Sequence, residues 1–161
     1  MLAQASELAR AGGSVRNVRL VLPPAVYDDI INHMLGGYPL EACGLLVGTA
    51  QEDGATQAVR FVPSPNLARS ALVYTLDPKV HLRAERDADD DDLAVIGVVH
   101  SHTHTDAFPS PTDVAAAADP SWEYVIVSLR DPSPSLRSYR IDGDTVKETP
   151  VLIFPTGSVG N

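Results

Sequence analysis

Two histidines separated by one residue, with an aspartate eleven residues after the second, are the side chains in this sequence best suited to bind a metal ion. His100 and His102 follow the apolar run 93–99, which is short, rich in β-branched residues and typical of a buried strand. Because alternate residues of a strand point to the same side, the two imidazoles can reach one point in space. Asp113 stands near the start of an expected helix, and a loop can return its carboxylate to that point.

Two imidazoles and one carboxylate are three ligands for a borderline cation such as zinc, and they leave a fourth position open for water. An open position is what separates a catalytic site from a structural one. A structural interpretation is also possible, in which the histidines are ordinary polar residues at a strand end. In it, Ser110 caps a helix, Pro111 is its first residue, and Asp113 imperfectly replaces the usual Glu or Gln of a capping box. The occurrence of His-x-His and Ser-x-x-Asp at this spacing in one chain favours a metal site.

A zinc hydrolase also needs a group that takes a proton from water and a donor that stabilises the oxyanion of a tetrahedral intermediate. Glu41 precedes the apolar segment 43–47, and a carboxylate in such surroundings is costly unless it has a partner. The alternative, an exposed loop residue, is equally compatible with its position. Ser110 lies on the loop that returns Asp113, so its hydroxyl is the candidate oxyanion donor.

The rest of the sequence predicts the elements that must position these residues. We expect strands over 18–22, 43–47, 56–62 (of edge type), 71–76, 93–99, 124–129 and 136–141, the last joined by the turn Asp142-Gly143-Asp144 to a strand over 145–153. We expect helices over 25–35, 78–87 and 111–118. The pattern predicts an α+β domain, a mixed sheet of seven or eight strands with two or three helices packed on it.

Length and composition place limits on the function. The 161 residues suit one domain over 17–154, with flexible ends over 1–16 and 155–161. A formal net charge of −9 argues against nucleic acid or an anionic membrane as a partner. The single cysteine excludes an intramolecular disulfide, and no stretch reads as a signal peptide or a membrane span. We therefore expect a cytoplasmic protein.

The pattern Glu41-x-x-Gly44, followed by His100-x-His102-x7-Ser110-x-x-Asp113, resembles the signature of the JAMM (MPN-plus) metallopeptidases. The resemblance covers roughly residues 18–153. It implies a curved mixed sheet flanked by helices in an α/β/α-type arrangement, related to the cytidine-deaminase-like fold. It also implies that zinc is held by the two histidines and the aspartate, that the glutamate activates a water, and that the serine steadies the oxyanion.

The resemblance further implies a substrate, because members of this family hydrolyse peptide or isopeptide bonds at the C-terminus of ubiquitin or ubiquitin-like proteins. Thr103 stands where many eukaryotic members have proline. Glu41-Ala42-Cys43-Gly44, His100-Ser101-His102-Thr103 and the segment 136–141 are similar to the bacterial branch. That branch includes the peptidase that releases cysteine from a sulfur-carrier protein ending in Gly-Gly. The oligomeric state stays open, with a homodimer as one option.

Several neighbouring residues have weaker signals. His104 would share the face of the two histidines in an extended strand, but the family has no ligand there, so we interpret it as a rim residue. Asn66, Arg69 and Ser70 precede an expected strand and are candidates for lining a substrate groove. Cys43 has no evident activating partner and is most simply a buried small hydrophobe.

Two other functions have to be weighed. A catalytically silent scaffold of the same fold would bind a protein partner only, but all five motif positions are present, which counts against it. A nucleotide deaminase would need a Cys-x-x-Cys pair beside a His-x-Glu, and the single cysteine excludes that ligand set.

Overall fold

The structure, a computed structural model, describes residues 17–154, so the expectations for residues 1–16 and 155–161 lie outside the described residues. Within that range no helix combines the length and the apolar character that a membrane crossing requires. The elements in chain order are β1 (Arg19–Leu22), α2 (Pro24–Gly37), β2 (Cys43–Ala50), β3 (Ala55–Ser64), α3 (Pro78–Asp90), β4 (Ala94–His102), α4 (Pro111–Ala116), β5 (Glu123–Ser128), β6 (Ser135–Asp142), β7 (Thr145–Thr149) and β8 (Val151–Ile153).

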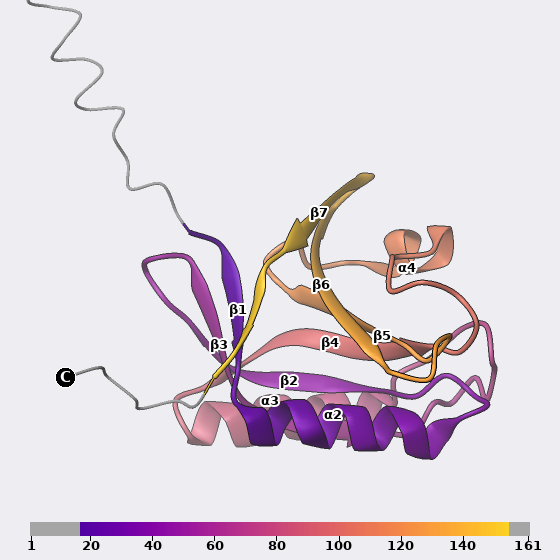
Figure 1. Cartoon of the computed structure of the whole chain (residues 1–161). Coiled ribbons are helices and arrows are strands. Elements are labelled where there is room, and N and C mark those ends of the chain that lie inside the picture. Colours follow the sequence, from indigo (N-terminus) through magenta and orange to yellow (C-terminus); the bar gives the residue numbers. More distant parts are fainter. Residues whose placement is uncertain (1–16, 155–161) are drawn as a thin grey trace, which may run out of the picture.

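The described strands form one mixed sheet in the order β7-β6-β5-β4-β2-β3-β1-β8 (Figure 1). The pairs β4–β5, β1–β3 and β1–β8 are parallel, and the other neighbours are antiparallel. β2 and β4 lie at the centre, and their register places Cys43 opposite His100. The predicted class, a curved mixed sheet flanked by helices, is confirmed.

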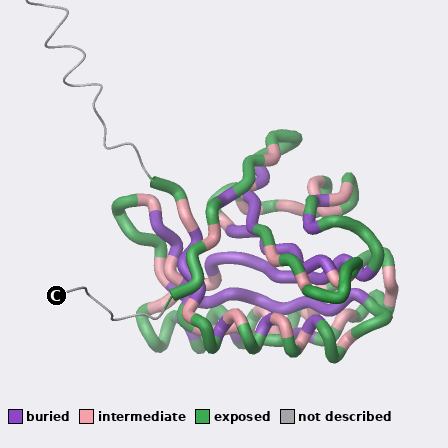
Figure 2. Tube along the Cα trace, in the orientation of Figure 1, coloured by how far each residue is buried: buried purple, intermediate pink, exposed green. Residues whose placement is uncertain are grey.

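The sheet is covered on both faces, and alternation along each strand sends side chains to two separate cores. On one face Leu46 and Val99 pack with Val26 and Ile30 of α2. On the other, Leu45 packs with residues of β4, β5, β6 and α3. In Figure 1 α2 lies in the foreground and α3 in the background, and Figure 2 shows the buried residues concentrated along the central strands. A strand buried on both faces has to be apolar almost throughout, which explains the near-continuous apolar runs of β2, β4 and β5.

Three strand predictions need correction. The segment 56–62 was expected at an edge, but β3 lies inside the sheet because β1 and then β8 add to its far side. The segment 71–76 is not a strand: its only ladder contact is an isolated bridge between Asn66 and Leu76. The Ser70 hydroxyl accepts hydrogen bonds from the N–H groups of residues 72 and 73, so a local turn competes with the extended conformation.

The expected single strand over 145–153 is also wrong, because the chain divides at Pro150 into β7 and β8, which lie at opposite edges of the sheet. Proline has no N–H to donate to a ladder and fixes its own φ, so it interrupts a strand. Its carbonyl is used instead, since it accepts a hydrogen bond of 2.9 Å from the N–H of Leu20.

Candidate metal centre

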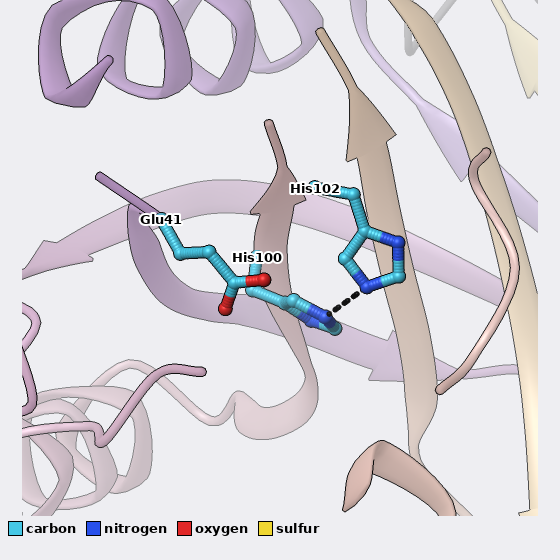
Figure 3. A group of neighbouring side chains, drawn as sticks. All are labelled: Glu41, His100 and His102. Carbon is cyan, nitrogen blue, oxygen red and sulfur yellow. Dashed lines mark hydrogen bonds between the residues drawn. The ribbon is translucent and has the colours of Figure 1, made fainter. Parts of the chain in front are cut away.

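The C-terminal end of β4 brings the two histidines together. His100 and His102 are 3 % and 5 % exposed, and their Nε2 atoms lie 3.1 Å apart (Figure 3). Both belong to the face of the sheet that carries Val98, as strand alternation predicts. Two unprotonated ring nitrogens at this distance repel each other unless something positive lies between them. The arrangement is therefore suited to holding a proton or a metal ion.

The start of α4 brings a carboxylate to the same point. Asp113 Oδ2 lies 3.2 Å from Nε2 of His100 and 3.1 Å from Nε2 of His102. The capping box expected to be imperfect is complete: Ser110 Oγ accepts a hydrogen bond from the N–H of Asp113, and Asp113 Oδ2 accepts one from the N–H of Ser110. The structural and metal-binding interpretations of these residues thus hold together, because the cap fixes the carboxylate that faces the imidazoles.

The three atoms form a nearly equilateral triangle with sides of 3.1 to 3.2 Å. Ligand atoms at about 2.0–2.1 Å from a tetrahedral zinc ion lie about 3.3 Å from one another. Two imidazoles and one carboxylate are also the donor set that zinc takes in catalytic sites. The residues present therefore fit a divalent cation of this kind.

Glu41 is buried beside the histidines, which decides against the exposed-loop alternative. It is 5 % exposed, and its Oε2 has no hydrogen-bond partner among the described residues. Figure 3 shows its carboxylate directed toward the two imidazoles. Backbone hydrogen bonds hold Glu41 there. Its N–H donates to the carbonyl of Ser70 at 2.8 Å. The N–H of Ala42 donates to Ser101 Oγ, and the carbonyl of Ala42 accepts from the N–H of Ser101. Burial is the main reason that the pKa of Glu41 rises to about 7.

Two sets of three ligands share the histidine pair. Ligand atoms of Glu41, His100 and His102 all lie within 4.8 Å of one another. Asp113 approaches the same nitrogens to within 3.2 Å. Both carboxylates therefore lie within reach of a cation that the two imidazoles could hold, and the assignment of Asp113 as the third ligand and of Glu41 as the proton acceptor stays a prediction.

The charges of the site suit cation binding. Burial lowers the pKa of His100, which favours the neutral imidazole that binds metals. Burial opposes ionisation of Asp113 as well, but the hydrogen bonds with both histidines outweigh it and hold the pKa of this carboxyl well below its usual value. For His102, burial lowers the pKa, but the hydrogen bonds with Asp113 and with the Asp106 carbonyl outweigh it and raise the pKa overall. The site thus presents a neutral His100 imidazole, a more basic His102 imidazole and an ionised Asp113 carboxylate.

A small cavity of about 210 Å³ opens beside the triangle. Its lining includes Glu41, His102, His104 and Ser110. Because Ser110 Oγ accepts from a backbone N–H, its own O–H proton is available to donate into the cavity. His104, the expected rim residue, is exposed there and packs edge-on against Tyr38 at a ring-centroid distance of 6.4 Å.

The other candidates for the groove lie elsewhere. Asn66, Arg69 and Ser70 are outside the described lining of this cavity. Asn66 is engaged internally: its Nδ2 donates to the carbonyls of Glu41 and Val73, and its Oδ1 accepts from the N–H groups of residues 68 and 75. It therefore connects the segment 66–76 to the Glu41 backbone, a function that its sequence position did not indicate.

Three contacts at or beside the histidines were not predicted from the sequence. The Nδ1 of His102 lies 2.8 Å from the carbonyl of Asp106, Ser101 bonds to Ala42, and the ring of Tyr74 stacks on His100. The first uses a backbone atom, which no side-chain pattern reveals. Strand alternation could have indicated the second, because Ser101 must face the side opposite to the histidines.

Cys43 is expected to be unreactive in the folded protein. It is fully buried, and burial is the main cause that raises the pKa of its thiol to about 11, so little thiolate exists near neutral pH. Treatment with a thiol-alkylating reagent at pH 7.5, followed by mass spectrometry, should give no adduct on the native chain and one adduct after denaturation. Native labelling at the rate of a free thiol would contradict this prediction and reopen a chemical role for the cysteine.

Comparison with known proteins gives concordant matches. The family described as prokaryotic homologs of the JAB domain matches residues 23–142. The CysO-cysteine peptidase of Mycobacterium tuberculosis (strain H37Rv) is 40% identical over 135 residues, which cover 83% of this chain and 90% of the relative. The solution structure of a Desulfitobacterium hafniense protein matches with a TM-score of 0.78 and 33% identity, over 84% of this chain and 93% of that one. A JAB1/MPN domain crystal structure from Archaeoglobus fulgidus, at 18% identity and a TM-score of 0.52 over 85% and 99% of the two chains, shares the fold.

Proposed function

The chain belongs to the prokaryotic homologs of the JAB domain, and we propose from this membership and from its site that it is a zinc-dependent metallopeptidase acting at the C-terminal Gly-Gly tail of a small ubiquitin-like or sulfur-carrier protein. The bond that it hydrolyses is the amide between the last glycine and an amine. The similarity to a CysO-cysteine peptidase favours cysteine as that amine. The reaction would then release cysteine from its carrier.

The observation that carries the proposal is the Glu41 carboxylate. It is buried, one of its oxygens lacks a partner among the described residues, and it lies beside two imidazoles and at the wall of a cavity. A buried carboxylate without a partner is unfavourable unless an ion or a substrate completes its surroundings. A scaffold that only bound a protein partner would not need a buried carboxylate oxygen without a partner.

His100, His102 and Asp113 would hold the zinc ion. When bound, zinc would polarise the scissile carbonyl and lower the pKa of a bound water to about 7. Glu41 would accept a proton from the attacking water, whose oxygen would add to the carbonyl carbon. The Ser110 hydroxyl donates a hydrogen bond to the oxygen that becomes negative. Glu41 then delivers the proton to the departing nitrogen as the C–N bond breaks, which returns every group to its starting state.

The dimensions of the site favour glycine next to the scissile bond. The cavity of about 210 Å³ is bounded by Ala71, Leu72 and Thr103 as well as by the groups that act on the substrate. Ligand pockets for drug-sized molecules are about 300–1,000 Å³, so this space accepts a narrow chain rather than a bulky side chain. An extended Gly-Gly tail meets that requirement.

Cleavage of a carrier conjugate tests the proposal. The zinc-loaded chain is expected to release cysteine from a CysO-type carrier joined through its Gly-Gly terminus to cysteine, with the intact carrier as the second product in mass spectrometry. Replacing the last glycine of the carrier by alanine should slow release by about 10²-fold, the usual cost of misplacing reacting atoms by about 1 Å.

A parallel conjugate with the same tail on a lysine side chain identifies the leaving group. Faster cleavage of the cysteine amide assigns the enzyme to cysteine release, and faster cleavage of the lysine conjugate assigns it to removal of a protein modifier. Failure of the folded, zinc-loaded chain to cleave either conjugate would refute the proposed substrate class.

A further inference from the structure

The two histidines of the site are held in place by different means. His102 has a hydrogen bond between its Nδ1 and the carbonyl of Asp106 at 2.8 Å. For His100 the hydrogen bonds involve Nε2 only, and no described residue in the range 17–154 offers a partner to its Nδ1. Histidines that bind metals almost always donate their second ring N–H to a fixed acceptor, which sets the ring orientation. His102 has such an acceptor, the carbonyl of Asp106, whereas no described residue provides one for His100.

An aromatic ring occupies the neighbouring position instead. Tyr74 stacks on His100 with a ring-centroid distance of 4.3 Å and an angle of 23° between the ring planes. His102 meets the same imidazole edge-on, at 5.0 Å and 63°. His100 is therefore held between a parallel face and a perpendicular ring, and it is only 3 % exposed. These contacts restrict rotation of the imidazole about χ2, a torsion that otherwise has a broad range of allowed angles in histidine.

The segment that carries Tyr74 is fixed from both sides. The amide of Asn66 accepts a hydrogen bond from the N–H of Thr75 at 2.9 Å and donates one to the carbonyl of Val73 at 3.1 Å, so it holds the two residues that flank the tyrosine. Through a further bond of 3.0 Å to the carbonyl of Glu41, the same amide ties this segment to the proposed proton acceptor. Tyr74 lies outside regular secondary structure, and these hydrogen bonds hold the backbone on both sides of it.

The hydroxyl of Tyr74 has no hydrogen bond to a described residue, whereas its ring makes the contact with His100. The ring also lines an apolar cavity of about 520 Å³ formed with Leu76, Val98, Trp122 and Tyr124. The part of the side chain that matters for His100 is consequently its aromatic face, which phenylalanine also has and an aliphatic residue lacks.

We propose that Tyr74 is a positioning residue that orients the His100 imidazole for metal binding by stacking on its face, in the way that the Asp106 carbonyl orients His102 by a hydrogen bond. This inference rests on the proposed role of His100 as a ligand. Tyr74 acts through His100 and not on the substrate. Loss of the ring should therefore weaken metal binding and lower kcat, and leave KM for the carrier nearly unchanged.

The test compares Tyr74→Leu with Tyr74→Phe. The zinc affinity of the purified chain, measured by competition with a chromogenic chelator, should fall by about 10–100-fold in Tyr74→Leu, the range for loss of a partner that orients a ligand. Tyr74→Phe should stay within about twofold of the wild type. In cobalt-substituted protein the visible absorption bands should change in Tyr74→Leu and be retained in Tyr74→Phe. Tyr74→Met, which is flexible and also lacks a ring, replaces the leucine variant if that variant does not fold.

Tyr124→Leu is the matched control, since Tyr124 is buried and lines the same cavity but has no ring contact with His100. It should unfold at a lower temperature and bind zinc as the wild type does. Wild-type affinity in the folded Tyr74→Leu or Tyr74→Met chain, or an equal loss in Tyr124→Leu, would overturn the inference. An equal loss in Tyr74→Phe would overturn it as well, because the hydroxyl would then be the important group. A wild type that binds no zinc would instead refute the proposed function.

Discussion

Replacing Glu41 by glutamine is expected to lower kcat/KM for the carrier conjugate by about 10²–10⁴-fold, the usual contribution of a general acid–base group. Glutamine has nearly the same shape as glutamate but cannot take a proton from water. The substitution should not remove the metal, because His100, His102 and Asp113 approach one another to within 3.2 Å without it. Activity would be measured by cysteine release and zinc content by atomic absorption on the same preparation.

The two measurements separate the possible roles of Glu41. A chain with one zinc and little activity would assign the carboxylate to proton transfer. Loss of zinc in Glu41→Gln would instead make Glu41 a ligand, the alternative allowed by its position within 4.8 Å of the histidine nitrogens. Full activity in Glu41→Gln would show that Glu41 is neither the proton acceptor nor a metal ligand. Glu52→Gln is the matched control, since Glu52 is exposed in the turn between β2 and β3 and should behave as the wild type.

Substitution of His102 by alanine is expected to abolish stoichiometric zinc binding and, with it, activity. The substitution removes one corner of the ligand triangle and leaves Asp113 with a single imidazole partner. Affinity should fall by more than the about 10–100-fold that loss of an orienting residue costs, because a direct ligand is lost. Zinc per chain would be counted after dialysis against trace-metal buffer. The zinc-dependent rise in melting temperature should disappear in parallel.

His104→Ala provides the comparison for this experiment. His104 lies two residues further along the chain and lines the same cavity, but it is exposed and packs against Tyr38. It should keep one zinc per chain. If zinc were absent from the folded wild type even after reloading, the scaffold function would become the better description. If His102→Ala bound zinc as tightly as the wild type, the metal would have to lie elsewhere.

The parts of the site that sequence could predict are those governed by local rules. Strand alternation places His100 and His102 on one side of β4 whatever the rest of the chain does. The capping box fixes Ser110 and Asp113 relative to each other within four residues. Only the return of α4 to the end of β4 needed tertiary structure, and the motif resemblance supplied that expectation. The roles of these residues in binding and catalysis remain predictions.

The parts that sequence could not predict depend on contacts between distant segments. The burial of Glu41 follows from the segment 66–76 and from Ser101, neither of which is near it in sequence. The sequence predicts a strand over 71–76, which includes Tyr74, but the ladder contact of this segment is a single isolated bridge at Leu76. The division of 145–153 at Pro150 was in principle visible, since proline interrupts ladders, and the hairpin signal obscured it.

The parallel pairing of β8 with β1 has a consequence for how the protein folds. It places Leu20 beside Val151, so the two partners of this edge are separated in sequence by almost the whole described chain. Contacts between residues so far apart in sequence raise the contact order and slow folding, because loop-closure entropy is lost before the contact stabilises the chain. The residues of the site lie on segments joined earlier in the chain, from β2 to α4. We therefore expect the β1–β8 edge to be protected late in hydrogen-exchange refolding, after the strands that carry the histidines.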